Sequence, residues 1–134
     1  MTTTRPSSTT ARIWPLAADL VCVMALAAGG RSSHEADEPV SIVLAIGWPF
    51  AVAATLAHLG LGLRGRPTAR SWPEGALVVA ATYALGMVLR AVSGRGLAPG
   101  FLVVAALFLA VTMLGWRLVV ALRQRRRSPQ GGDS

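Results

Sequence analysis

Four long apolar segments, separated by short polar connections, make up most of the chain. They cover residues 13–30, 40–63, 74–93 and 98–122, which is about 18 to 25 residues each. A helix needs about 20 apolar residues to cross a bilayer, and backbone groups in lipid must be hydrogen-bonded within their own segment. We therefore predict an all-α fold, an integral membrane bundle of four transmembrane helices within residues 13–122.

The two ends of the chain are polar and differ from the apolar segments in composition. Residues 1–12 are rich in Ser and Thr, and residues 123–134 contain a basic run followed by Pro and Gly. Segments of this kind bury too little apolar surface to fold, so we predict two disordered tails. The connections between the apolar segments are short, which makes sequential helices antiparallel neighbours.

The arginines are distributed unevenly between the two predicted ends of the bundle. The formal net charge is +7, and every basic residue is Arg. Nine of them lie in the tails or the second connection, on one predicted side: Arg5, Arg12, Arg64, Arg66, Arg70, Arg123, Arg125, Arg126 and Arg127. The positive-inside rule therefore predicts cytoplasmic N- and C-termini in the cell membrane. Because the arginines flank apolar spans and no nucleic-acid motif is present, we do not expect nucleic acid as a partner.

The first apolar segment has a second interpretation, as a cleaved signal peptide. It combines a basic start, an apolar centre and the sequence Ala-Leu-Ala at residues 25–27, as a signal peptide and its cleavage site would. Asp19 lies where a signal peptide should be apolar, and the segment is long enough to span a bilayer. We therefore favour a first transmembrane helix.

Three ionisable side chains interrupt the apolar segments at similar predicted depths. Asp19 lies about 9 Å from the start of its segment, and His58 and Arg117 lie about 7.5 Å from the ends of theirs. An unpaired charge in hydrocarbon costs about 2.5–3.5 kcal/mol, and an arginine can meet a carboxylate through two parallel hydrogen bonds. We predict that Asp19 and Arg117 pair and join the first and fourth helices. Alternatively, Arg117 extends to the nearby headgroups.

Small residues at helical spacing indicate the faces that pack inside the bundle, because they let membrane helices approach closely. The predicted inward positions are Gly47, Ala51, Ala54, Thr55, His58 and Gly62; Gly75, Thr82, Gly86 and Arg90 or Ser93; and Ala106, Ala110 and Met113. His58 is either a proton relay, since histidine titrates near neutral pH, or a hydrogen-bonded residue of the core. The second role is the more common one for a lone histidine on such a face.

The positions of one proline and three tryptophans add local detail to the predicted helices. Pro49 removes a backbone donor and should kink its helix, either as a tolerated bend or as a hinge beside a cavity. Trp14, Trp72 and Trp116 fall toward the predicted cytoplasmic ends of their segments. This placement is typical of an aromatic belt at the membrane surface.

The opposite predicted end carries a polar group made of Arg31, His34, Arg90 and Arg95, together with three acidic residues of the first connection. These arginines could bind an anion or a lipid headgroup, but we favour a solvated loop whose acids balance the nearby arginines. The spacing of His34 and the acids matches no metal motif, so we expect no metal and no cofactor. The sequence contains no phosphate loop, nucleophile elbow or paired-histidine zinc helix, so we expect that the protein is not an enzyme.

Several short motifs, taken in order, resemble an uncharacterised family. They are Asp19, Gly30 to His34, Trp48-Pro49-Phe50, Gly86 with Arg90, and Phe101 with Leu114-Gly115-Trp116-Arg117. In this order and spacing they resemble the bacterial and archaeal family called domain of unknown function 3054, over about residues 13 to 122. The resemblance implies a four-helix integral membrane protein without an assigned activity. It also implies that Asp19, Arg31, His34, Arg90 and Arg117 matter together.

These observations favour a small, non-enzymatic membrane protein that acts as an accessory or regulatory component. Its expected partners are the lipid bilayer and either a second copy of itself or another membrane protein. The alternative is a small dimeric transporter or channel that uses Asp19 as its coupling acid. Against it, Asp19 is off-centre and Tyr83 is the only tyrosine available to surround a cation. A lipid-headgroup enzyme built on the polar group around His34 is a third, weaker hypothesis.

Overall fold

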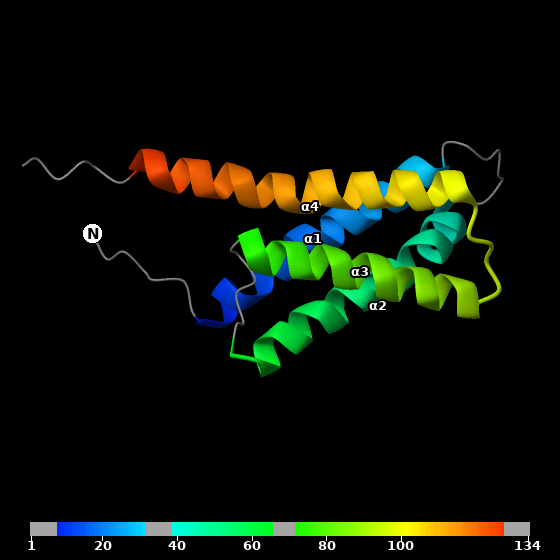
Figure 1. The fold of residues 1–134 in the computed structure, drawn as a ribbon, viewed down its shortest axis with the longest axis horizontal. Helices are drawn as coiled ribbons and strands as arrows, with labels where there is room; N and C mark the ends of the chain where they lie inside the picture. The colour runs from blue at the N-terminus through cyan, green and yellow to red at the C-terminus, as the bar shows by residue number, and fades with distance from the viewer. Residues whose placement is uncertain (1–7, 32–38, 66–71, 128–134) are drawn as a thin grey trace, which may run out of the picture.

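The computed structural model describes residues 8–31, 39–65 and 72–127, and it describes the side chains of residues 13–29, 40–65 and 72–127. Four α-helices account for almost all of them: α1 (Ser8–Arg31), α2 (Pro39–Leu63), α3 (Trp72–Val92) and α4 (Pro99–Arg127). Figure 1 shows these helices lying roughly along one direction. The predicted all-helical fold with four helices is confirmed.

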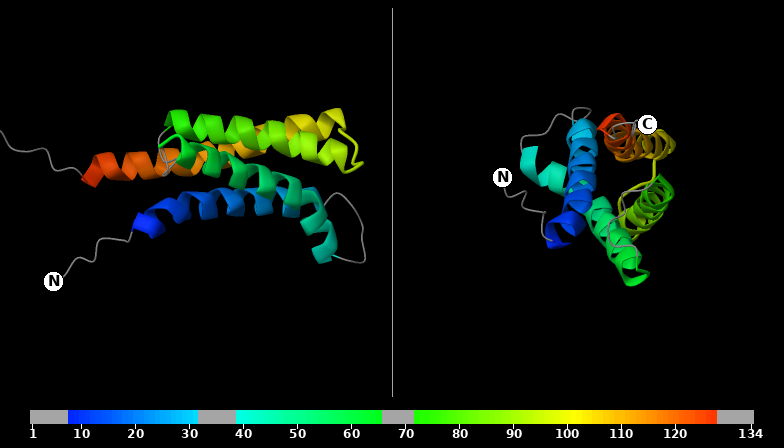
Figure 2. Two further views of the ribbon diagram at one scale, coloured as in Figure 1. Left: turned by 90° about the horizontal axis from the view of Figure 1, so that it is seen from below. Right: turned by 90° about the vertical axis from the view of Figure 1, so that its left-hand side faces the viewer.

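The helices form a closed ring in which each helix packs against two others. Contacts join α1 to α2, α2 to α3, α3 to α4, and α4 back to α1. The end view in Figure 2 shows this arrangement around a central axis. The start of α1, the end of α2, the start of α3 and the end of α4 lie toward the same end of the bundle (Figure 1). The short connections predicted this antiparallel order.

Two helices are longer than the apolar segments that predicted them. Helix α1 begins at Ser8, and helix α4 continues through Gln124 and four arginines to Arg127. The prediction of disorder for residues 1–12 and 123–134 is therefore wrong for residues 8–12 and 123–127. Apolar composition marks the part of a helix suited to lipid, whereas Arg and Gln have high helix propensity and continue the same helix into water.

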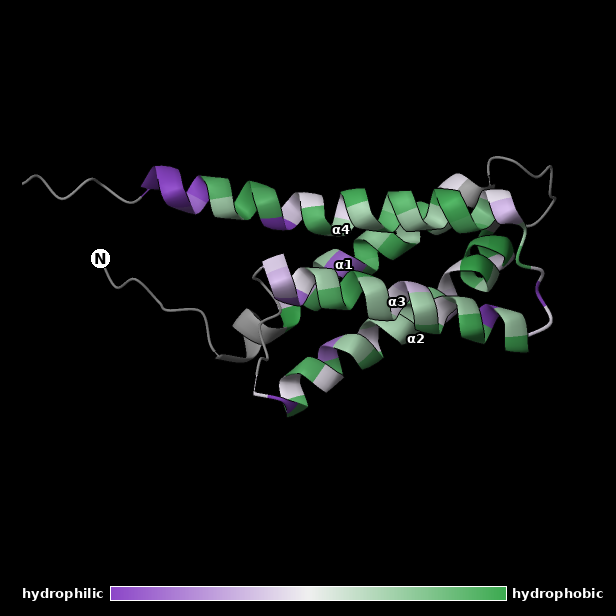
Figure 3. Cartoon of the chain, viewed as in Figure 1, coloured by the Kyte–Doolittle hydropathy of each residue, from purple (hydrophilic) through white to green (hydrophobic). Residues whose placement is uncertain are grey.

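Three of the helices are long and apolar enough to cross a membrane: Val40–Leu63, Trp72–Val92 and Pro99–Arg127. In α1 the corresponding apolar stretch, Ile13–Gly29, is shorter. Figure 3 shows apolar residues over most of the helical surface and polar residues gathered at the last turns of α4. Large apolar side chains are exposed on every helix, among them Val21, Leu59, Val88 and Val111.

The interior of the bundle is packed with apolar side chains around Phe50. A β-carbon added to Gly86 of α3 would lie 2.7 Å from Phe50 Cε1 and closer still to Cδ1, so only glycine fits there without movement. Gly75, Thr82 and Gly86 are all buried, as the small-residue pattern of α3 predicted. On α2 the pattern was wrong for Thr55 and Gly62, which are exposed. Small residues occur on more than one side of α2, so their spacing alone does not identify the inward face.

Helix α2 bends in its N-terminal part, which is drawn in cyan and turns away from the rest of the helix in Figure 2. Pro49 lies inside α2, between its N-terminal part and its middle, and is buried. Its ring removes one backbone donor and presses on the preceding turn, which bends a helix. The predicted kink is therefore present.

Candidate functional site

A buried polar network joins α1, α2 and α4 around the carboxylate of Asp19. Asp19 is completely buried and Arg117 is 1% exposed. Arg117 Nη1 donates to Asp19 Oδ1 at 2.9 Å, and Nη2 donates to Oδ2 at 2.8 Å. These two parallel hydrogen bonds are the geometry in which a guanidinium pairs most strongly with a carboxylate. Arg117 therefore faces the bundle interior and does not extend to the headgroups.

Two further donors complete the surroundings of the carboxylate. Trp116 Nε1 donates to Asp19 Oδ1 at 2.8 Å. His58 Nε2 lies 2.6 Å from Oδ2 and donates to it, because an ionised carboxylate offers only acceptors. Each oxygen thus accepts two hydrogen bonds. A carboxylate has about four lone-pair sites, so Asp19 has no acceptor site left.

Arg117 is held by more than Asp19, and it brings α3 into the same cluster. Its Nη1 also donates to the backbone oxygen of Met113 at 2.7 Å, one turn earlier in α4. Its guanidinium lies 4.3 Å from the ring centroid of Trp116. A β-carbon on Gly75 of α3 would lie 2.8 Å from Arg117 Nε. All four helices therefore meet at this network, which we call the Asp19 network: Asp19, His58, Trp116 and Arg117, with Gly75 against the arginine.

Local sequence explains why Arg117 points inward. The buried residues of α4 are Ala105, Leu109, Met113 and Arg117, spaced four apart along the helix. Residues with this spacing share one face, so the side that packs against the core also carries the arginine. On α1, Asp19 and Val23 have the same spacing and are both buried. Among the described side chains, Asp19 of α1 and Arg117 of α4 are thus the buried charged residues, and the two helices place them at one level.

The charges of the network cancel within the bundle. A buried charge without a partner costs several kcal/mol, and the cost is lowest when every polar atom is hydrogen-bonded. The Asp19 carboxylate and the Arg117 guanidinium are opposite in sign and directly bonded. His58 donates one more hydrogen bond and needs no charge to do so. Chemically the network is suited to holding helices together, because a fifth donor or a metal ion would have to displace one of four existing hydrogen bonds.

The residues predicted at the opposite end of the bundle are only partly described. His34 and the side chain of Arg31 lie outside the described residues. Arg90 is half-buried, donates from Nε to the backbone oxygen of Gly96 at 3.3 Å, and lies 4.2 Å from the ring centroid of Phe101. Arg95 is exposed. The structure therefore brings Arg90 to an aromatic ring and a backbone carbonyl, and it shows no joint site for the four predicted residues within the described part of the chain.

Metal binding finds no support among the residues that are described. Within residues 8–31, 39–65 and 72–127, no group of three or more His, Cys, Asp or Glu side chains could hold a metal ion. His58 and Asp19 are adjacent but surrounded by the donors of Arg117 and Trp116. Donors repel a cation, so this pair is a poor start for a metal site.

Sequence reasoning missed two members of the network. Trp116 was assigned to an aromatic belt, but its N–H group turns inward to Asp19 and its ring packs edge-on against Trp14, with centroids 4.8 Å apart. Gly75 was expected on an inward face, but not against an arginine. The adjacency of Trp116 to Arg117 was a usable signal, because a tryptophan N–H near a buried carboxylate usually finds it as a partner.

Comparison with known protein families places the chain in one of them. Residues 16–120 match the family described as Protein of unknown function (DUF3054), which is well over half of the 134-residue chain. The matched region contains every member of the Asp19 network. No curated protein and no solved structure matches the chain. The chain therefore belongs to the DUF3054 family, a family of unknown function whose helices here are long and apolar in the manner of membrane proteins.

Proposed function

We propose that this chain is a non-enzymatic integral protein of the cell membrane, an accessory or regulatory component whose four helices are clamped together by the Asp19 network. The observation that carries the proposal is the complete occupation of the Asp19 carboxylate by four donors from α2 and α4. A carboxylate that moves a proton or cation must exchange partners. One that is fully bonded is better suited to fixing helices in place.

A membrane location is supported by three long apolar helices, and by the inward-facing acid and the length of α1. Helix α1 contains an acid, but that acid faces inward and is paired, as is usual for charges within membrane helices. Its apolar stretch, Ile13–Gly29, is shorter than those of the other helices, but polar turns at both ends lengthen α1 to 24 residues, or about 36 Å, so the whole helix is longer than a hydrocarbon core of about 30 Å. All four helices are therefore proposed to cross the bilayer.

The proposed orientation has both termini in the cytoplasm. Arg64 follows α2, and four arginines lie in the last two turns of α4, at the end of the bundle where α1 begins. Among the described residues, the opposite end has three arginines: Arg31 at the end of α1, Arg90 and Arg95. Arginine excess marks the cytoplasmic side.

The exposed surface supports a role in assembly. Apolar side chains such as Leu44, Leu107 and Val119 are more than 45% exposed, and they suit lipid or another transmembrane helix. We propose a second copy of this chain or another membrane protein as the partner on this surface.

The alternative, a small transporter that uses Asp19 as its coupling acid, requires the network to open. Asp19 is completely buried, and it is not among the lining residues of the grooves along Ala51–Leu63 of α2 that the structure shows.

The decisive experiment compares Asp19→Asn with Glu74→Gln in the full chain. Asp19→Asn leaves the Arg117 charge buried without its counter-charge, which costs about 3–5 kcal/mol. Glu74 lies in the first turn of α3, where an acid contributes about 0.3–1 kcal/mol. Unfolding in detergent should therefore show a large loss for the first variant and a small one for the second, and vesicles with the unaltered chain should show no proton or cation flux. Asp19-dependent flux, with Asp19→Asn as stable as the unaltered chain, would establish the transporter instead.

A further inference from the structure

A groove on the outer surface between α1 and α2 leads to His58. It has a volume of about 440 Å³, within the size range of small-molecule sites. Its walls are the apolar side chains of Ile13 and Leu16 on α1 and of Leu59 and Leu63 on α2. His58 lines it from the inside, although this residue is only 8% exposed.

A second groove continues the first along the same pair of helices. It has a volume of about 330 Å³ and is lined by Leu20 of α1 and by Ala51, Val52, Thr55 and Leu56 of α2. Thr55 lines both grooves. From Leu63 to Ala51 the seam follows 13 residues of α2, or about 18 Å. An extended apolar chain fits a seam of this shape, with its polar end at His58 and its tail toward the middle of the bundle.

The hydrogen bond to Asp19 fixes what His58 offers to the groove. Its Nε2 carries a hydrogen and donates to Asp19. Among the described residues, His58 Nδ1 has no hydrogen-bond partner. This nitrogen is not fully enclosed by the bundle. A second positive charge beside Arg117 would leave the network with a net charge in an apolar setting, which is costly. In the neutral imidazole with hydrogen on Nε2, Nδ1 is an acceptor.

Thr55 provides a second acceptor in the same groove. Its hydroxyl donates to the backbone oxygen of Ala51 at 2.8 Å, which uses its only hydrogen and leaves lone pairs free to accept. Thr55 and His58 are three residues apart and so are neighbours on the helix surface. Among its described lining residues the groove has no Asp, Glu, Lys or Arg, and His58 is its neutral imidazole acceptor. A ligand that complements it is uncharged, apolar along most of its length, and carries a hydroxyl donor.

We propose that the groove between α1 and α2 binds a neutral membrane lipid whose head group is a hydroxyl, with that hydroxyl donating to His58 Nδ1. The proposal rests on the membrane location proposed above. It adds a ligand to the Asp19 network, because the lipid hydroxyl, His58 and Asp19 then form one hydrogen-bonded line from the lipid into the bundle. Lipid occupancy would thereby be coupled to the contact between α1 and α2.

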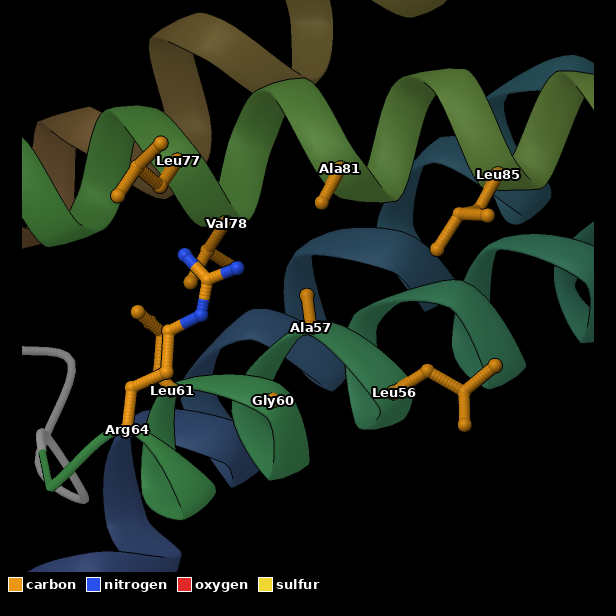
Figure 4. A pocket seen from close by; sticks show the side chains of 9 residues that line it. All are labelled: Leu56, Ala57, Gly60, Leu61, Arg64, Leu77, Val78, Ala81 and Leu85. Atoms are coloured by element: carbon orange, nitrogen blue, oxygen red, sulfur yellow. The ribbon is translucent and has the colours of Figure 1, made fainter.

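The groove between α2 and α3 provides a matched comparison (Figure 4). It has a volume of about 290 Å³ and is lined by apolar side chains, with Arg64 as its polar residue. Gly60 lines this groove and Gly62 lines the groove at His58. A β-carbon at either glycine meets no atom within 4 Å. The β-carbon of a leucine is therefore free at either position, and we expect the rest of its side chain to occupy the groove that the glycine lines.

The test uses the full chain in phosphatidylcholine nanodiscs that contain small amounts of dioleoylglycerol, with bound lipid counted by mass spectrometry of the intact complex. The unaltered chain should bind one dioleoylglycerol about fivefold more tightly than the O-methyl ether of the same lipid, which is the effect of one net hydrogen bond. Gly62→Leu should weaken dioleoylglycerol binding at least tenfold. Gly60→Leu should bind it as the unaltered chain does.

Two results would overturn the proposal. One is equal retention of dioleoylglycerol, its methyl ether and phosphatidylcholine, which would mean that the groove holds any acyl chain. The other is equal binding by Gly62→Leu and Gly60→Leu. Neither glycine belongs to the Asp19 network, so failure here with unchanged melting of both variants leaves the clamp intact. Failure of the membrane location would be recognised separately, as release of the chain from membranes by alkaline carbonate.

Discussion

The two ends of the bundle each bury part of an arginine, and they do so in different ways. Arg117 is almost fully buried and bonded to a carboxylate, to a backbone oxygen and to the face of a tryptophan ring. Arg90 is half-buried over the Phe101 ring, and its Nη1 is buried without a hydrogen-bond partner among the described residues. An arginine is enclosed deeply only where an acid and sufficient acceptors are supplied by other helices.

The difference predicts that the two ends contribute unequally to stability. At the Asp19 network, one residue change affects contacts among four helices. At Arg90, the described contacts join α3 to the start of α4 and to Gly96 just before it. Variants at the Asp19 network should therefore lower the stability of the bundle more than variants at Arg90, and such variants test the comparison.

Of the two variants that test this comparison, Gly75→Ala is expected to have the larger effect. The added methyl group would lie 2.8 Å from Arg117 Nε, so the arginine must move and its bonds to Asp19 are strained. Overpacking of this kind costs about 1–3 kcal/mol. Gly115→Ala in α4 is the control, because its methyl group meets nothing within 4 Å and alanine favours a helix. Chemical unfolding in detergent should show destabilisation for the first variant and none for the second; equal stability would contradict the close approach of α3 to Arg117.

A smaller effect is expected for Arg90→Leu. This variant loses the contact with the Phe101 ring and the hydrogen bond to Gly96, but it also removes an unpaired buried nitrogen. A cation–π contact contributes about 0.5–2 kcal/mol, and the gain from removing the unpaired group offsets part of the loss. The midpoint of thermal unfolding should fall by only a few degrees, and the exposed Arg95→Leu should leave it unchanged. A loss as large as that of Asp19→Asn would show that the two ends are equivalent.

The sequence was sufficient to predict the helices, their order and the contact between Asp19 and Arg117. Long apolar runs require helices, short connections require antiparallel neighbours, and two opposite charges at one depth are expected to meet. His58 was placed at the same depth from its sequence position alone. The structure adds that it contacts the same carboxylate.

The other contacts could not be predicted from the sequence, because they depend on how each helix is rotated about its axis. Trp116 has a lipid-compatible ring and a polar N–H, so it suits either a membrane surface or a buried acceptor. Thr55 and Gly62 belong to a pattern of small residues that continues around α2, and they line an outer groove. In an apolar environment the outward face is as apolar as the inward one, so hydrophobic periodicity does not set the rotation. Only the packed structure shows which residues meet.

The central claim is that Asp19 and Arg117 stabilise the bundle as a pair, and a double-mutant cycle in detergent tests it most directly. Asp19→Leu and Arg117→Met should each lower the free energy of unfolding by about 3–5 kcal/mol, because each leaves one buried charge alone. The double variant leaves neither charge, so it should be more stable than either single variant. If the two losses instead add within about 0.5 kcal/mol, the residues act independently and the clamp is contradicted.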